Sequence, residues 1–93
     1  QISPASLKVR LLDTERSLSL ELIAVVPNLK VPFKVSQTIP IEEFDASTFT
    51  INPLKTYVMV CQKGVNSYLA TKKLKAKYPT LDVLNLTGGI RSY

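Results

Sequence analysis

The 93-residue sequence contains no histidine and a single cysteine, Cys61. Without an imidazole, Cys–His hydrolase chemistry is excluded, and so are most zinc sites, which use several Cys or His ligands. One thiol can form neither an internal disulfide nor a Cys-x-x-Cys redox pair. We therefore expect a cytoplasmic protein that uses no metal and no other cofactor.

Long apolar segments are lacking as well. No hydrophobic run approaches the length that crosses a bilayer, and no signal peptide is recognisable, so we expect no membrane partner. Hydrophobic residues make up 45% of the chain and charged residues 20%, which is ordinary for a globular protein. We expect residues 1–93 to form one domain with a modest core, either excised from a longer chain or C-terminal in it.

The N-terminal part of the chain predicts one helix and one strand. Ser3 followed by Pro4 is typical of a helix start, and we expect the helix to end near Thr14. The apolar positions of this helix are Leu7, Leu11 and Leu12. Residues 18–26 alternate at first and then become wholly apolar, which predicts a strand that enters the core and ends before Pro27.

The rest of the chain predicts short strands that alternate with helical segments. We expect a loop with one short extended piece at 28–38, a short strand at 39–41, a turn of helix at 42–46, buried strands at 57–60 and 83–86, and a final helix after Gly88-Gly89. Such alternation favours parallel pairing with helices on both faces. The predicted fold class is α/β, a three-layer α/β/α domain with a mostly parallel sheet of about five strands.

The chemistry of the sequence is concentrated between Tyr57 and Ser67. An apolar strand ends at Cys61, and a short polar turn containing Gly64 leads into a helix. The thiol therefore lies at the C-terminal end of a strand and at the N-terminus of a helix, the edge where open α/β sheets bind ligands. Backbone N–H groups and the helix dipole favour anions at this position, so the pKa of the thiol would be lowered and its thiolate would be a nucleophile.

A purely structural role for Cys61 is the alternative, because free cysteine is among the most buried residue types. Two neighbours favour a ligand-binding loop instead. Gly64 supplies the freedom in φ that a loop wrapped around an ion requires, and Ser67 stands where an N-cap or first-turn hydroxyl would lie. The helix that follows has one face formed by Ser67, Ala70, Leu74 and Tyr78.

Several motifs together resemble the rhodanese-like sulfurtransferase domains. Cys61-x-x-Gly64-x-x-Ser67 follows a strand, and residues 83–90, Val-Leu-Asn-Leu-Thr-Gly-Gly-Ile, come at the separation found in that family. Residues 39–44 are similar to the family's Ile-Pro-Leu-x-x-Leu segment, and residues 2–7 to its opening helix. The resemblance covers nearly the whole chain and implies the rhodanese-like fold.

The resemblance also implies a double-displacement sulfurtransferase. Cys61 would take sulfane sulfur from thiosulfate or a persulfidated protein, hold it as a persulfide and pass it to a nucleophilic or protein acceptor. The loop would stabilise anionic sulfur through its backbone N–H groups, those of Gln62, Lys63, Gly64, Val65, Asn66 and Ser67. The side chains of Lys63 and Arg91 are expected to attract an anionic substrate to the sulfur.

The spacing Cys61-x-x-Gly64-x-Asn66-Ser67 looks like the rhodanese domains fused to ubiquitin-activating-like adenylyltransferases of molybdopterin and tRNA thiolation. A fused adenylyltransferase domain is therefore a possible partner, although Val65 departs from the asparagine usual there. Gln62 replaces the arginine that thiosulfate sulfurtransferases carry after the cysteine, which weakens binding of a small dianion. A protein-bound donor depends less on that charge, which favours sulfur relay over thiosulfate detoxification.

One departure favours a second function. Where the family's first long strand usually ends in Asp-Val-Arg, residues 24–26 are Ala-Val-Val, which removes polar contacts that support the loop. A catalytically degenerate rhodanese-like module that binds proteins is therefore the alternative. Cysteine-dependent phosphatases are disfavoured, because they require an arginine at the position of Ser67.

The charge balance of the chain is basic, with 12 Lys and Arg against 7 Asp and Glu, a net +5. One predicted helix carries a cluster of lysines: Lys72, Lys73, Lys75 and Lys77. The simplest interpretation is a solvated helix face, and the alternative is a docking surface for an acidic protein acceptor. Because no aromatic stripe interleaves with these lysines, we do not expect nucleic-acid binding.

Overall fold

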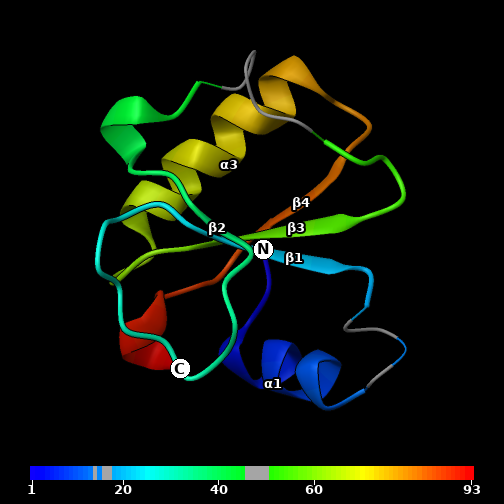
Figure 1. Cartoon of the computed structure of the whole chain (residues 1–93), viewed down its shortest axis with the longest axis vertical. Helices are drawn as coiled ribbons and strands as arrows, with labels where there is room; N and C mark the ends of the chain where they lie inside the picture. Colours follow the sequence, from blue (N-terminus) through cyan, green and yellow to red (C-terminus); the bar gives the residue numbers. More distant parts are fainter. Residues whose placement is uncertain (14, 16–17, 46–50) are drawn as a thin grey trace.

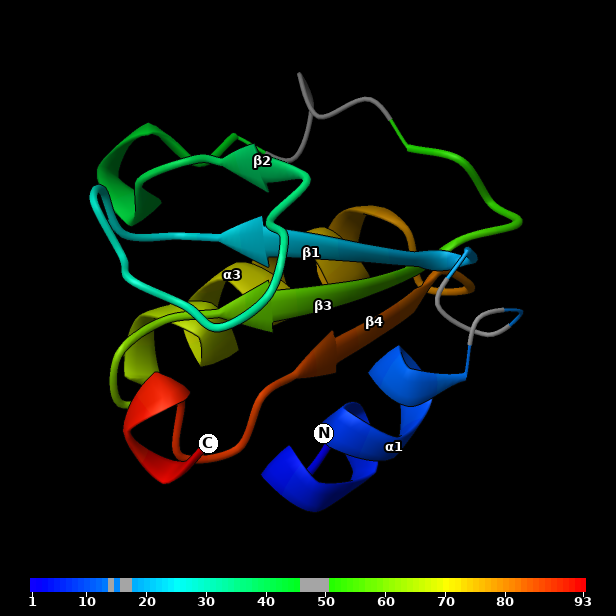
Figure 2. The same cartoon turned by 60° about the horizontal axis from the view of Figure 1, so that its bottom comes forward.

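The computed structural model describes residues 1–13, 15, 18–45 and 51–93. Its centre is a parallel sheet with the strand order β2-β1-β3-β4. The strands are β1 (Leu20–Ala24), β2 (Gln37–Thr38), β3 (Thr56–Val60) and β4 (Asp82–Asn85). Figure 2 shows β1, β3 and β4 side by side with their arrows pointing the same way.

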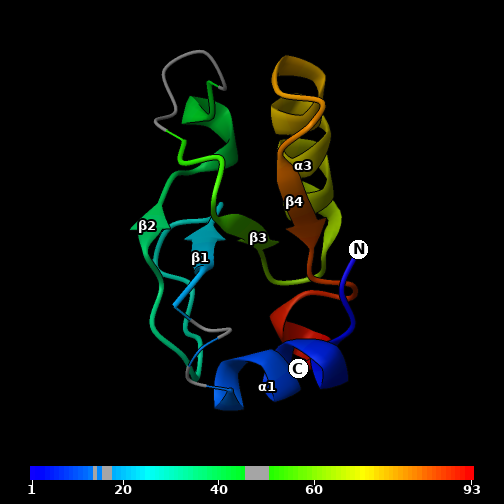
Figure 3. The ribbon, with the colours of Figure 1, turned by 90° about the vertical axis from the view of Figure 1, so that its right-hand side faces the viewer.

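Helical segments lie on both faces of the sheet, so the predicted three-layer α/β/α architecture is confirmed. In Figure 1, α3 (Val65–Lys77) and the short 3₁₀ turn η1 (Ile41–Glu43) lie above the strands. Below them lie α1 (Pro4–Leu12) and a second 3₁₀ turn, η2 (Ile90–Ser92). Figure 3, which looks toward the edge of the sheet, shows α1 and α3 separated by the strands.

The alternation of side chains along the strands divides the apolar residues into two cores. The core beneath α3 is formed by residues such as Ile23, Tyr57, Met59, Val83, Ala70 and Leu74. The core beneath α1 is formed by Ile2, Leu7, Leu22, Val58, Val60 and Leu86. Since both faces of the central strands are covered, their sequences are nearly continuous apolar runs, as is typical of parallel sheets.

The first helix begins as predicted but presents a narrower apolar face than expected. The Ser3 hydroxyl accepts a hydrogen bond from the Ser6 N–H at 3.1 Å, and Pro4 occupies the first turn. Leu7 is buried, whereas Leu12 is 86% exposed. The prediction that Leu12 belongs to the apolar face is wrong, because each residue turns the helix by roughly 100° and Leu12 points away from the sheet.

The sheet is smaller at its margins than the sequence predicted. Among the described residues it has four strands rather than five, and the N-terminal segment adds only a single parallel bridge between Ile2 and Leu86. The short extended piece expected within 28–38 is confirmed as β2, Gln37–Thr38. The strand expected at 39–41 is wrong, because Ile41 begins the turn η1, although the Ile39 N–H still donates to the Ala24 carbonyl at 2.8 Å.

The remaining predicted elements are present in shortened form. The helical turn expected at 42–46 is η1, whose described part is Ile41–Glu43, and the final helix is the single turn η2. Thr14 and Ala46, where two predicted elements end, lie outside the described residues. Within the part of the chain that the structure describes, no helix combines the length and apolar character needed to cross a membrane.

The topology brings three loops to one edge of the sheet. Because β1, β3 and β4 are parallel, the segments that follow them all begin at their carboxyl ends, and Figure 2 shows these segments gathered on one side. Residues 61–64 connect β3 to α3 at this edge, and residues 86–89 lead from β4 into η2. Loop residues from separate parts of the sequence therefore meet around Cys61.

Candidate functional site

Cys61 is the residue that directly follows β3, and it is buried, with 2% of its surface exposed. Its sulfur does not simply fill the core. The backbone N–H of Gly64 donates to Cys61 Sγ at 3.0 Å, and Ser67 Oγ lies 3.2 Å from the same atom. The sulfur is therefore surrounded by polar groups of the loop and of the first turn of α3, as an anion at a helix N-terminus would be.

Gly64 gives the loop its shape. Its φ is +92°, in the left-handed region, and it stands immediately before the first residue of α3. A Cβ atom placed on Gly64 would lie 3.0 Å from the backbone nitrogen of Gly88. The left-handed conformation turns the Gly64 N–H back toward the sulfur, and glycine adopts it without the steric cost of a side chain. The predicted positive φ is confirmed.

The Gly88-Gly89 turn is packed directly on the cysteine loop. The N–H of Ile90 donates to the carbonyl of Cys61 at 2.8 Å, and the N–H of Arg91 donates to the carbonyl of Gln62 at 3.0 Å. In a trans peptide the N–H points in the direction opposite to the C=O. Because the Cys61 and Gln62 carbonyls point toward the Gly88-Gly89 turn, the N–H groups of the same two peptides point to the other side of the loop. A Cβ on Gly89 would lie 2.6 Å from the Cys61 carbonyl oxygen, so this contact requires glycine.

A buried polar pair lies beneath the sulfur. Ser67, fully buried on α3, donates its hydroxyl hydrogen to Oδ1 of Asn85 at the end of β4. Asn85 in turn directs Nδ2 to the Gly64 carbonyl at 3.4 Å. Ser67 and Asn85 are the buried polar residues of the described chain. Burying two polar side chains is costly unless they are hydrogen-bonded, so their mutual pairing fixes the Ser67 hydroxyl beside Cys61.

The electrostatics of the loop favour the thiolate. Burial raises the pKa of Cys61, but hydrogen bonding with the Ser67 hydroxyl and with the backbone N–H groups of Ser67, Gly64 and Lys63 outweighs this effect. The pKa of the thiol therefore lies below that of a free cysteine. Hydrogen bonds that favour the charged form are the physical cause, and a lowered pKa is what activates a cysteine nucleophile at neutral pH.

A small pocket of about 150 Å³ opens at Cys61. It is lined by Cys61, Gln62, Lys63, Val65, Asn66 and, from the segment after β1, Val26. An adjoining hollow shares Val26 and Gln62 with this pocket and is also lined by Lys30 and Ile90. The walls of the pocket are thus apolar and amide groups, with one lysine at the pocket and a second in the adjoining hollow.

The structure brings together most of the residues that the sequence singled out. Residues 61–67 form one continuous loop and first helical turn around the sulfur. The N–H groups of Lys63, Gly64 and Ser67 act on Cys61. Gln62, Val65 and Asn66 line the pocket, and the donor role expected of their N–H groups stays a prediction. Arg91 contacts the loop through its backbone, and its exposed side chain is not among the pocket-lining residues, so its role toward substrate stays a prediction.

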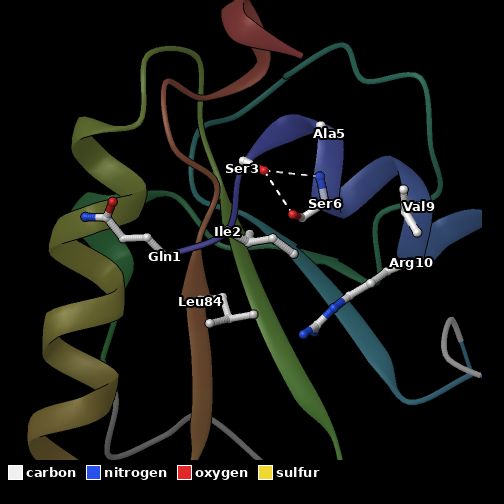
Figure 4. A pocket seen from close by; sticks show the side chains of 8 residues that line it. All are labelled: Gln1, Ile2, Ser3, Ala5, Ser6, Val9, Arg10 and Leu84. Carbon is white, nitrogen blue, oxygen red and sulfur yellow. Dashed lines mark hydrogen bonds between the residues drawn. The ribbon is translucent and has the colours of Figure 1, made fainter.

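A larger hollow, of about 450 Å³, lies at a different place and offers less chemistry. Figure 4 shows it between the N-terminal segment, α1 and the edge strand β4, with the side chains of Ile2, Val9 and Leu84 among its walls. Its two serines are hydrogen-bonded to each other, Ser3 to Ser6 at 3.0 Å, in the cap of α1. This hollow contains no nucleophile other than hydroxyls already engaged in capping, so we assign the functional site to Cys61.

Three solved structures are similar to this model over almost its whole length. A rhodanese-like domain protein from Staphylococcus aureus has a TM-score of 0.78 and 23% sequence identity, and the match covers 98% of this chain and 87% of that one. A rhodanese homologue from the extremely thermophilic bacterium Thermus thermophilus has a TM-score of 0.77 and 21% identity, with 99% of this chain and 98% of that one covered. A rhodanese-related protein from Thermoplasma volcanium has a TM-score of 0.68 and 23% identity, with 99% of this chain and 87% of that one covered. No protein-family model and no curated protein matches the chain.

The chain has a rhodanese-like fold. The predicted fold class is therefore confirmed, with one strand fewer than expected in the described residues. Val26, the last residue of the Ala-Val-Val sequence at 24–26, lines the Cys61 pocket.

Two features of the site were not anticipated from the sequence. The sequence places Asn85 in the predicted strand 83–86 without indicating a role for it, and its contact with Ser67 joins residues 18 positions apart. An asparagine inside an otherwise apolar strand is a signal that could have indicated a buried hydrogen-bond partner. Lys30, in a loop with no recognisable motif, gave no such signal, and only the topology places it near Gln62.

Proposed function

We propose that this rhodanese-like domain is a sulfurtransferase that carries sulfane sulfur as a persulfide on Cys61. The observation that supports this most is the cradle itself, in which the Gly64 N–H donates to Cys61 Sγ at 3.0 Å while the pKa of the thiol is lowered. A cysteine that only fills the core requires neither three backbone N–H donors nor an open pocket beside its sulfur. Preorganised donors aimed at one atom stabilise charge that develops there during reaction.

The chemistry proceeds by two displacements at sulfur. The Cys61 thiolate attacks the outer sulfur of the donor, the donor's S–S bond breaks, and the donor leaves as a thiolate, or as sulfite when the donor is thiosulfate, with the bonding electron pair. Cys61 then bears a persulfide whose terminal sulfur is anionic. A nucleophilic acceptor attacks that sulfur, the new S–S bond breaks, and the Cys61 thiolate is regenerated. The cradle stabilises the anion in both half-reactions.

The pocket favours a protein persulfide over free thiosulfate as the donor. Its walls are formed by Val26, Val65 and the amide side chains of Gln62 and Asn66, with Lys63 as the cation at the pocket. A dianion in such a pocket would lose hydration without bidentate arginine contacts to replace it. A thiol-derived persulfide carries less charge and would bring apolar atoms to the two valines. A fused adenylyltransferase domain as the source of the acceptor remains a prediction.

Intact-mass spectrometry after incubation with thiosulfate, or with a persulfidated peptide, tests the proposal. We expect the protein to gain the mass of one sulfur atom, and subsequent cyanide to remove that mass with formation of thiocyanate. Cys61→Ser should gain nothing while retaining the melting temperature of the native protein, because serine is nearly isosteric. Unfolding of Cys61→Ser would favour a structural cysteine, and unchanged transfer by that variant would exclude the mechanism.

A degenerate protein-binding module is the second candidate function, and one observation favours it. Residues 24–26, at the end of β1 and directly after it, lack the charged residues of the family's Asp-Val-Arg, and Val26 lines the pocket instead. Under that hypothesis no donor would load Cys61, while alkylation of the thiol would still proceed. The mass measurement therefore separates the two functions, because only the sulfurtransferase accumulates the persulfide.

A further inference from the structure

We propose that the outward face of α3 is the surface on which the sulfur-exchanging partner protein docks, and that this partner presents an acidic surface containing apolar residues. The inference rests on the proposed function, since it assigns the partner of that site. We call the surface the α3 face and define it by Val65, Tyr68, Leu69, Lys72 and Lys73. It begins at the mouth of the Cys61 pocket and follows the helix away from it.

The first half of the α3 face is apolar although it faces solvent. Val65 is 64% exposed, Tyr68 44% and Leu69 46%. Single exposed apolar residues are common, but these three lie within the first two turns of one helix at spacings of three and four, which makes them neighbours on its surface. The opposite side of the same helix is already buried through Ser67, Ala70 and Leu74, so the sheet does not require these outward residues.

The apolar half of the α3 face adjoins the Cys61 pocket. Val65 both lines the Cys61 pocket and begins the α3 face. A partner that contacts Val65 and Leu69 therefore comes to rest over the opening through which sulfur must pass. Figure 1 shows α3 as the outer layer of the molecule, with the strands on its other side.

The second half of the α3 face is basic, and α3 itself contains no acidic residue. The helix carries four lysines and not one Asp or Glu along its whole length, Val65–Lys77. Lys75 and Lys77 lie in the last turn, where cations are stabilised by the helix dipole. That account does not extend to Lys72 and Lys73 in the middle of the helix. Without acidic residues three or four positions away, no helical ion pair can form around them.

A cation–π contact joins the two halves of the face. The Lys72 ammonium lies 5.5 Å from the centre of the Tyr68 ring. The ring thus connects apolar and cationic parts into one surface, and Lys63 adds a further cation where that surface meets the pocket. A mixed surface of aromatic, aliphatic and cationic groups is complementary to a protein surface that contains acidic and apolar residues, and complementary charges accelerate correct encounter.

Sulfur transfer from designed peptides tests the assignment. The probes are two synthetic peptides with one persulfidated cysteine and one leucine, flanked in the first by Asp and Glu and in the second by Lys. The rate at which Cys61 gains sulfur is followed by intact mass. We expect the acidic peptide to react about tenfold faster at low salt and to lose that advantage as salt screens the charges.

Charge reversal on the α3 face supplies the decisive variant. Lys72→Glu/Lys73→Glu should remove the preference for the acidic peptide or invert it, while transfer from thiosulfate stays near its original rate. Lys8→Glu/Lys34→Glu makes the same change in net charge at exposed positions outside α3 and should keep the preference. A Val65→Ser/Leu69→Ser variant should slow both peptides, since each carries the leucine. Circular dichroism and melting temperatures confirm that the variants fold.

Each failure has a distinct meaning. Equal rates for both peptides, or equal losses in the two charge-reversal variants, would overturn the α3 face while leaving the sulfurtransferase intact. If no donor loads Cys61, the proposed function fails, and docking is judged instead by fluorescence anisotropy of the labelled thiol peptides. Tighter binding of the acidic peptide, abolished by Lys72→Glu/Lys73→Glu, would then support the surface on a binding module. Stronger competition by a single-stranded oligonucleotide would overturn it in favour of nucleic acid.

Discussion

The hydroxyl of Ser67 is held between Asn85 and Cys61. It donates its hydrogen to Asn85 Oδ1, and its oxygen lies 3.2 Å from Cys61 Sγ, where it accepts the hydrogen bond of the neutral thiol. A thiolate cannot donate, so ionisation of Cys61 requires the Ser67 hydrogen to turn toward the sulfur. Asn85 can permit this by presenting Nδ2 to the Ser67 oxygen, because an amide has both a donor and an acceptor side.

Asn85→Asp should therefore raise the pKa of Cys61. A carboxylate accepts hydrogen bonds and donates none, so it would retain the Ser67 hydrogen, and its negative charge would oppose a nearby thiolate. The measurement is the pH dependence of iodoacetamide alkylation, which reports the thiol pKa without any sulfur transfer. We expect the midpoint of alkylation to rise in Asn85→Asp relative to the native protein.

A double-mutant cycle separates the hydrogen-bond effect from the charge effect. Ser67→Ala alone should also raise the midpoint, because the thiolate loses one donor. In the Ser67→Ala background, Asn85→Asp should add a smaller rise, since only the charge effect remains. Equal rises in both backgrounds would show that Asn85 acts on Cys61 without involving Ser67.

Stability should depend on pH through Cys61. The folded pKa of this thiol is lowered, because the Ser67 hydroxyl and the loop N–H groups outweigh the effect of burial. A lowered acid pKa contributes stability that is fully present above the unfolded pKa, about 8.5 for cysteine, and is lost as the pH falls through the folded pKa. The free energy of unfolding of the native protein, minus that of Cys61→Ala, should therefore increase as the pH rises from the folded pKa to the unfolded pKa of the thiol and level off above it.

Urea unfolding of both proteins at several pH values provides this difference. Subtraction cancels the titration of residues that the two proteins share, and the constant packing loss of Cys61→Ala shifts the difference without changing its slope. Ser67→Ala should flatten the slope because it removes one of the interactions that lower the pKa. A difference that is constant or decreases with pH would mean that the loop does not favour the thiolate.

The extent to which the sequence predicts this site depends on the range of the interactions involved. The fold and the cysteine cradle follow from local patterns, namely an apolar strand ending at Cys61, a glycine at 64, and a helix whose inner face is Ser67, Ala70 and Leu74. These patterns are confirmed because strand, turn and helix are contiguous in the chain. Cys61 is buried and also lines a pocket, because residues 61–64 curve around its sulfur.

Interactions between distant segments were not predictable in the same way. Asn85 lies beside Ser67 only because β3 and β4 are paired in register, with Met59 opposite Asn85. The position of β2 depends on where the chain leaves the sheet, which propensities do not determine. The Gly88-Gly89 motif was recognised from its resemblance, whereas its physical function, fixing the Cys61 and Gln62 carbonyls, became apparent only from the hydrogen bonds.

Lys63→Ala should raise the KM for thiosulfate with a smaller effect on kcat. Lys63 lines the pocket and is exposed, so its charge attracts an anion without contacting the sulfur in the core. Its influence is screened over about 8 Å at physiological salt, and added salt should therefore reproduce the change. Steady-state kinetics with thiosulfate and cyanide provide the measurement. Lys30→Ala serves as the graded comparison, because Lys30 lines only the adjoining hollow and should have a weaker effect.

The result that contradicts this prediction is a KM insensitive both to Lys63→Ala and to salt. Such a result would place the Lys63 side chain outside the path of the donor. An effect on kcat alone would indicate that the substitution disturbed the loop, since the Lys63 backbone N–H is one of the groups that lower the pKa of Cys61. Lys63→Gln, which keeps most of the length of the side chain, distinguishes loss of charge from loss of packing.

Gly64→Ala should lower both the free energy of unfolding and the rate of sulfur transfer, and the loss in rate should be the larger effect. At a φ of +92° an alanine is strained, and its Cβ would lie 3.0 Å from Gly88 N, in backbone that cannot easily move. The loss in the free energy of unfolding should be about 1 kcal/mol or more. The rate of sulfur transfer should fall by more than the loss of stability explains, because relaxing the strain rotates the Gly64 N–H away from Cys61 Sγ.

Val83→Ala provides the matched control for Gly64→Ala. Val83 is buried in the core beneath α3, away from the loop, so its truncation should cost stability through packing alone. At a temperature where both variants are fully folded, Val83→Ala should transfer sulfur at nearly the native rate, whereas Gly64→Ala should not. The alkylation midpoint of Cys61 should rise only in Gly64→Ala. If both variants retain full transfer and an unchanged midpoint, Gly64 shapes an ordinary turn, and the cradle does not act on the sulfur.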